Sequence, residues 1–111
     1  MQGVFKLMQG EAHIGDFVID SDKNIWTYAA AAETAPEAQP LVFRLLMRDQ
    51  GGDTLSGDAV RDWIMERAPE PTYEFIDALM YRIGIAEYDP LAFVAYNGGR
   101  FNKDDYYLTG A

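Results

Sequence analysis

Three short apolar runs, rich in β-branched and aromatic residues, lie within the first thirty residues of the chain. They cover residues 4–8, 13–19 and 25–28, and this composition is typical of strands. A Gln-Gly pair separates the first two runs, and five short polar residues separate the second from the third. Such residues favour turns, because their side chains hydrogen-bond the local backbone or tolerate left-handed geometry. The spacing predicts an antiparallel meander.

Prolines and glycines divide the middle of the chain. Residues 29–40 consist largely of Ala, Glu and Pro, and we interpret them as an irregular connector, since Pro36 and Pro40 would break a helix. The apolar run at residues 41–47 predicts a further strand. Residues 51–57 are rich in glycine but lack the Lys-Ser/Thr pair of a phosphate-binding loop. They therefore indicate a flexible connector.

From Ser56 onward the apolar positions recur at helical spacing. The first predicted helix contains Val60 and Ile64 and ends before two prolines. The second covers residues 75–83 and is followed by a glycine, the residue favoured just after a helix. An Asp-Pro pair then predicts a short helix at residues 91–96, because Asp caps a helix and Pro fits its first position.

The order of these elements defines the fold class. Strands come first and helices follow, which is typical of α+β proteins. We predict an N-terminal antiparallel β-meander, then about three helices, and a possible C-terminal strand at residues 106–108. A length of 111 residues suits one domain, so residues 1–111 are treated as a single domain.

The composition removes much of the usual enzyme chemistry. The chain has no Cys and one His, which excludes disulfides, thiolate zinc sites, Cys nucleophiles and paired His ligands within one chain. No arrangement of residues meets the geometric requirements of an active site. We therefore expect a non-catalytic protein with no cofactor and no metal. The absence of Cys and of a signal-peptide pattern at the start predicts a cytoplasmic protein without a membrane segment.

The charge is strongly acidic, with 18 acids against 9 bases and a net charge of −9. Ten of the acids and three of the bases fall within residues 49–89. This excess argues against direct binding of nucleic acid or an anionic membrane, because the bases are scattered. It favours either simple solubility, or binding to a basic partner, including mimicry of nucleic acid.

One acidic stripe stands out as a candidate partner-binding site. Asp58, Asp62 and Glu66 occupy positions i, i+4 and i+8 of the first predicted helix, so they share one face. That face is either solvated or a docking surface for a basic partner. Trp63 lies next to the stripe, and it is either a core anchor or an interface hot spot. Met65 completes the candidate set.

Five stretches of the chain together resemble a known bacterial module. They read VFKLMQGEAHIGDF at 4–17, PLVFRLL at 40–46, GDAVRDWI at 57–64, RIGIAEYDPLAF at 82–93, and NGGR followed by DDYYL at 97–108. These stretches are similar to the N-terminal module of HipA-type serine/threonine kinases of toxin–antitoxin systems. One departure is MERAP at residues 65–69, where the family usually has Leu-Leu-Pro-Glu.

The resemblance implies a function without catalysis. Nothing after residue 108 corresponds to the kinase domain, so no ATP site or catalytic aspartate can be carried over. The resemblance implies a protein partner, a HipA-like kinase, which the chain would regulate in trans as an antitoxin or accessory subunit. The alternative is an acidic inhibitor that mimics nucleic acid and occupies a basic nucleic-acid-binding protein.

Overall fold

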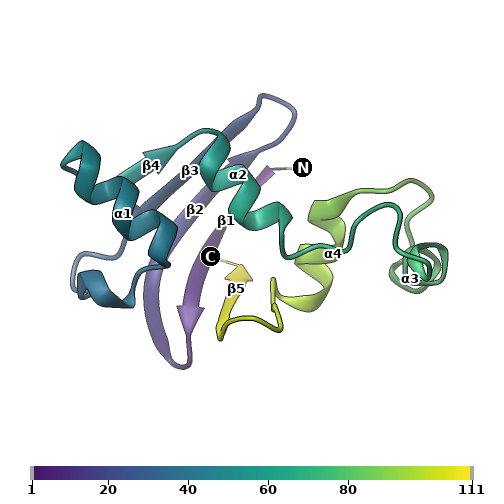
Figure 1. Cartoon of the computed structure of the whole chain (residues 1–111). Coiled ribbons are helices and arrows are strands. Elements are labelled where there is room, and N and C mark those ends of the chain that lie inside the picture. Colours follow the sequence, from purple (N-terminus) through teal and green to yellow (C-terminus); the bar gives the residue numbers. More distant parts are fainter. Residues whose placement is uncertain (1, 111) are drawn as a thin grey trace.

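The computed structural model describes residues 2–110, and its centre is a five-stranded antiparallel sheet (Figure 1). The strands lie in the order β4-β3-β2-β1-β5, so the last strand pairs with the first. Their bounds are β1 Gln2–Gln9, β2 Ala12–Asp20, β3 Ile25–Ala30, β4 Thr54–Ser56 and β5 Tyr106–Gly110. This arrangement confirms the predicted meander and the C-terminal strand.

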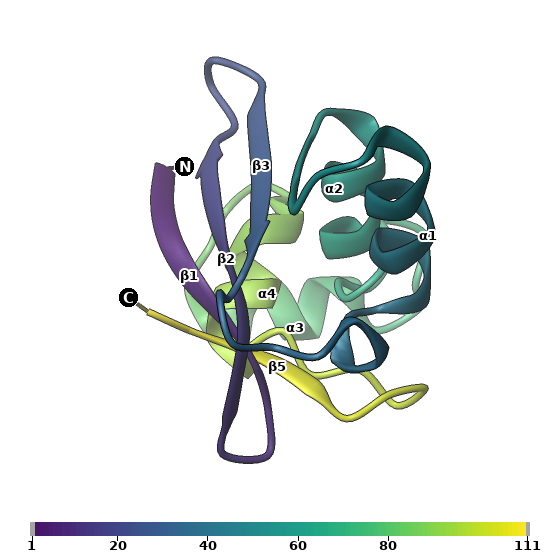
Figure 2. The same ribbon diagram turned by 90° about the vertical axis from the view of Figure 1, so that its left-hand side faces the viewer.

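Four α-helices and a short 3₁₀ helix complete the fold. They are η1 Pro36–Ala38, α1 Leu41–Gln50, α2 Asp58–Met65, α3 Ile76–Ile83 and α4 Pro90–Asn97. Figure 2 shows the sheet nearly edge-on, with α1 and α2 together on one side of it. The α+β class is therefore confirmed, with one more α-helix than the sequence predicts. None of the helices in the described range is long and apolar enough to cross a membrane.

The start of α4 is formed as the Asp-Pro pair predicts. The Asp89 side chain accepts a hydrogen bond from the backbone N–H of Leu91 at 3.1 Å, and Pro90 occupies the first helical position. The helix ends at Gly98, which has the left-handed conformation that glycine adopts without strain. These local signals placed the helix correctly because they act on the backbone itself.

The predicted strand at residues 41–47 is wrong, since these residues form most of α1. A continuous apolar run fits a strand or a buried helix equally well. Leu, Arg and Met favour helices, and the pair Phe43 and Met47, spaced four apart, is buried on one helix face. Gly51 then closes the helix, its N–H donating to the Met47 carbonyl at 2.9 Å.

The connectors on either side of α1 contain more regular structure than the sequence predicts. Residues 54–56 are strand β4, not a flexible connector, because Leu55 is buried opposite Tyr28 of β3. Strand β3 extends to Ala30, and Pro36 begins η1 rather than preventing a helical turn. Proline fits there because the first helical position needs no N–H donor.

An aromatic cluster fills the space between the sheet and the two helices. The Phe17 ring centroid lies 4.8 Å from that of Tyr28 and 6.1 Å from that of Phe43, and the Tyr28 and Phe43 centroids are 4.7 Å apart. Such tilted and edge-to-face pairs stabilise a core beyond the area they bury. The Tyr28 hydroxyl donates to the Gln39 side-chain oxygen at 2.5 Å, so the one polar atom of the cluster is satisfied.

Burial of Tyr28 predicts a loss of stability in alkali. Desolvation raises the pKa of its hydroxyl well above the ordinary value near 10, and the neighbouring Tyr106 and Asp16 raise it further. As the pH rises, the unfolded chain therefore loses this proton before the folded chain does. The stability that the neutral Tyr28 hydroxyl contributes is complete below pH 10 and is lost as the pH rises above it. We expect this one group to lower the free energy of unfolding by up to about 1.4 kcal/mol per pH unit above pH 10. Urea unfolding of the wild type and Tyr28→Phe between pH 8 and 11.5 measures it; equal slopes would contradict the assignment.

Candidate functional site

The acidic stripe of α2 faces solvent, but two of its three acids are already paired. Asp58, Asp62 and Glu66 are all exposed. The Arg61 guanidinium lies 3.4 Å from the Asp58 carboxylate and 3.1 Å from that of Asp62. Arg61 therefore offsets part of the negative charge within the same helix.

Trp63 and Met65 point the other way, toward the core. Both are partly buried and pack against the hydrophobic cluster. The Trp63 ring stacks on Phe17 with centroids 5.7 Å apart, and its centroid lies 5.2 Å from that of Phe43. The five residues of the predicted partner-binding site therefore lie on one helix but divide into an acidic outer face and an apolar inner face.

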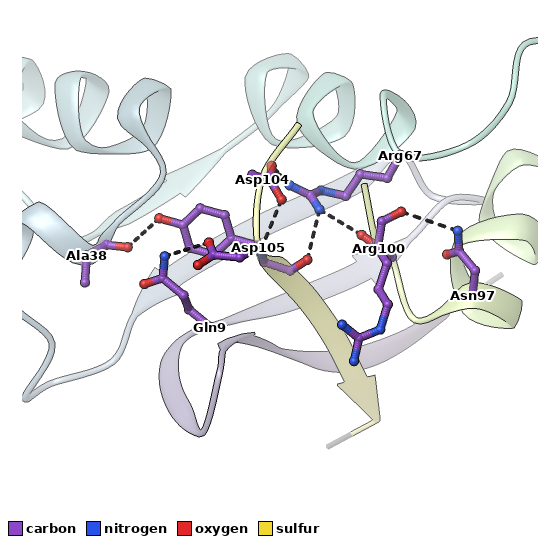
Figure 3. A network of polar contacts seen from close by, with 9 residues as sticks. Gln9, Ala38, Arg67, Asn97, Arg100, Asp104 and Asp105 are labelled. Carbon is purple, nitrogen blue, oxygen red and sulfur yellow. Dashed lines mark hydrogen bonds and ion pairs between the residues drawn. The ribbon is translucent and has the colours of Figure 1, made fainter. Parts of the chain in front are cut away.

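A buried arginine holds the C-terminal end of α2 to the last strand (Figure 3). Arg67 forms an ion pair with Asp104 and donates to the Gly99 carbonyl at 2.8 Å. The guanidinium carbon also lies 3.8 Å from the Trp63 ring centroid, a cation–π contact. The adjacent Asp105 accepts a hydrogen bond from Gln9 at 2.8 Å. These two aspartates thus have structural partners.

Three exposed aromatic residues, Tyr73, Phe75 and Tyr81, lie within residues 70–89, which we call the α3 segment. Helix α3 has no buried residue, although its sequence is amphipathic. Phe75 is 56% exposed and Tyr81 is 90% exposed, and Tyr73 packs edge-to-face on Phe75. Figure 1 shows α3 at one end of the molecule, away from the sheet. Tyr73 and Phe75 thus form an aromatic pair in solvent, and exposed aromatic side chains are typical of interaction surfaces.

The base of the α3 segment is fixed to the rest of the fold. The Tyr88 hydroxyl donates to the Pro69 carbonyl at 2.7 Å, which joins the two ends of the segment. The Tyr88 ring also lies against Phe93 of α4, with centroids 5.9 Å apart. Burial first, and then the charges of Glu70 and Asp89, raise the pKa of Tyr88. The segment is thus held in place as a projecting loop and helix.

The α3 segment is also acidic. It carries five acids and a single base, Arg82. All five acids are exposed, and they are Glu70, Glu74, Asp77, Glu87 and Asp89. The segment that carries the aromatic side chains therefore has a net charge of −4, five acids against one base.

The sequence predicts a helix at residues 75–83, and it also contains a signal for this surface that the candidate site on α2 did not include. Ile76, Leu79 and Ile83 form an apolar stripe at helical spacing, and such a stripe normally packs on a core. Tyr81 lies outside that stripe, yet it is a large aromatic residue. Aromatic residues on the polar side of a short helix, bounded by prolines, indicate a surface function better than a core function.

Comparison with known proteins gives no relative. No protein-family model, curated protein or solved structure matches this chain. The resemblance to the HipA N-terminal module therefore rests on the sequence motifs alone. Within residues 2–110, no three His, Asp or Glu side chains are grouped so that they could hold a metal ion.

Proposed function

We propose that this chain is a non-catalytic protein-binding module that docks its partner on the α3 segment. The observation that supports this most is the exposure of Phe75, the N-cap residue of α3, and of Tyr81 within α3, a helix that buries none of its residues. Exposed apolar side chains are costly in water unless another surface covers them. The segment of twenty residues is close to the size of one side of a standard protein interface.

The charge around the α3 segment defines the chemistry of the partner. The segment contains five acids and one base beside its aromatic residues, so the matching surface combines apolar groups with Lys and Arg. A second copy of this chain fits poorly, because each copy carries a net charge of −9 and the same acidic rim. We therefore infer a different, basic protein as the partner.

We further propose that this partner is a HipA-like kinase, which the chain regulates in trans as an antitoxin or accessory subunit. The support is the resemblance of the motifs between residues 4 and 108 to the N-terminal module of these kinases. A free-standing module of that kind would expose the surface that it uses to contact a kinase. The exposed apolar residues of the α3 segment, and Leu41, Val42 and Leu45 of α1, supply such surface.

An affinity capture from the lysate of the native host tests both levels of the proposal. The bait is the wild type, the variant Phe75→Ser/Tyr81→Ser, and the control Tyr96→Ser, which removes an exposed aromatic residue from α4. A kinase-like protein that survives a high-salt wash, and that only the α3 variant fails to capture, would support the proposal. A basic nucleic-acid-binding protein lost at high salt would instead favour the nucleic-acid mimic, because ionic contacts are screened.

If the α3 segment serves binding rather than stability, the same variants should be almost as stable as the wild type. Phe75→Ser/Tyr81→Ser is expected to change the free energy of unfolding by no more than about 0.5 kcal/mol per substitution, because both side chains are largely exposed. Urea unfolding followed by far-UV circular dichroism measures this change. A loss of several kcal/mol would show that the two aromatic residues belong to the folded core, and would contradict the assignment of a free surface.

A further inference from the structure

A groove at the opposite end of the molecule from α3 combines apolar walls with two arginines. Its volume is about 770 Å³, and it lies between the chain that follows β3 and the C-terminal half of α1. The apolar part of the lining consists of Ala30, Ala31, Ala32, Pro36 and Met47. Arg44 and Arg48 line the same groove. Their spacing of four residues on α1 places both guanidinium-bearing side chains on one face of the helix.

The two arginines are available to a ligand. The half-buried Arg44 side chain makes no hydrogen bond or ion pair with any residue in the range 2–110. Arg48 has only a long contact, 3.9 Å from the Asp49 carboxylate, and its side chain is 73% exposed. In contrast, Arg61 and Arg67 are each paired with aspartates. The groove thus carries two cations without a close carboxylate partner, although the charge of Arg44 also acts on the Tyr106 hydroxyl.

We propose that this groove binds a small amphipathic anion, with an apolar body along the alanines and one carboxylate between Arg44 and Arg48. The volume lies within the range of small-molecule sites, which are mostly apolar with a few polar groups that orient the ligand. Guanidinium groups bind carboxylates through paired, charge-assisted hydrogen bonds.

The surroundings favour a single negative charge over a phosphate dianion. The Asp53 side chain belongs to the same lining, and the groove lies toward the carbonyl end of α1, where the helix dipole is negative. Each of these features opposes a negative charge, and it opposes a dianion about twice as strongly as a single carboxylate. The groove is also separate from the α3 segment, since α1 and α3 lie at opposite ends of the fold (Figure 1).

Titration with decanoate, followed by ¹H–¹⁵N NMR below the concentration at which micelles form, tests this proposal. The largest amide shifts are expected in two stretches, residues 30–34 and 51–53, which line the groove. Binding of 1-decanol, which has the same apolar body without the charge, is expected to be at least tenfold weaker. Shifts concentrated on the α3 segment, or equal binding of the alcohol, would overturn the proposal.

Two double variants that remove the same charge test whether Arg44 and Arg48 bind the decanoate carboxylate. Arg44→Gln/Arg48→Gln is expected to weaken decanoate binding about tenfold or more, the loss that corresponds to about 1.4 kcal/mol. The control Lys23→Gln/Arg82→Gln removes the same charge from exposed positions outside the groove and should change binding less than twofold. If the first double variant does not fold, Arg48→Gln alone carries the test, since Arg48 is on the surface. Equal affinities of the charge-matched variants would overturn the proposal.

Discussion

Replacing Arg67 by methionine is expected to lower the free energy of unfolding by about 3 kcal/mol, near the lower end for breaking a buried ion pair. Its side chain is 2% exposed and is paired with Asp104, whose side chain is 27% exposed. Water can therefore reach the carboxylate that remains, which limits the loss. The Gly99 carbonyl also loses its donor and the cation–π contact with Trp63 is lost, while methionine keeps much of the apolar volume of the side chain. Urea unfolding at pH 7 measures the change.

Arg61→Met is the matched control for this experiment. Arg61 lies on the same helix and contacts two aspartates, but those aspartates are largely exposed. Exposed ion pairs contribute little, so a loss below about 1 kcal/mol is expected. If the Arg67 and Arg61 variants lost equal stability, the buried network would not be what joins α2 to the last strand. Asp104→Asn should fall between the two, because it keeps a hydrogen-bond acceptor for Arg67.

The comparison of α4 and α1 shows which signals in a sequence suffice to place an element. Helix α4 was predicted because Asp89 and Pro90 act on the local backbone, whatever packs on the helix. Residues 41–47 carry no comparable cap, and their run of apolar side chains fits a strand as well as a helix. What selects the helix is tertiary: Phe43 completes the aromatic cluster with Phe17 and Tyr28. The sequence does not reveal this contact, because it forms only when α1 packs on the assembled sheet.

The sheet was predictable only in part, for a similar reason. The first three strands follow one another along the chain and are joined by short turns, so each pairs with its neighbour in sequence. Strand β4 is three residues long, and its pairing with β3 depends on Leu55 meeting Tyr28. The pairing of β5 with β1 brings together residues about a hundred positions apart. No pattern within either strand specifies that contact.

The candidate surface could not be located by charge alone. The acids of α2 form a regular stripe in the sequence, but the same helix supplies Arg61 to two of them. The apolar face of α3 is indistinguishable in sequence from a core face, since the difference is whether another element covers it. In the fold the apolar stripe of α3 is half-buried and none of its residues is fully buried, so the docking surface we propose moves from the α2 stripe to residues 70–89. The acidic character of the predicted site is common to both.

Replacing Gly15 of β2 is expected to cause the second large loss of stability. Gly15 lies in β2 beside the Tyr28 side chain, and a methyl group there would overlap the ring and the hydroxyl. Gly15→Ala therefore forces Tyr28 out of position and disrupts its hydrogen bond to Gln39, which in turn donates to the Ile14 carbonyl. Overpacking together with one lost buried hydrogen bond is expected to cost about 3 kcal/mol. Thermal and urea unfolding measure this loss.

Two further variants separate this steric cause from a general intolerance of alanine at glycine positions. Gly52→Ala introduces the same methyl group where no atom lies within 4 Å, and it should change stability by less than about 0.5 kcal/mol. Tyr28→Val removes the ring that the methyl would strike, so adding Gly15→Ala to this variant should cost much less than it does in the wild type. Strictly additive losses in this double-mutant cycle would contradict the contact, because residues that clash must show coupling.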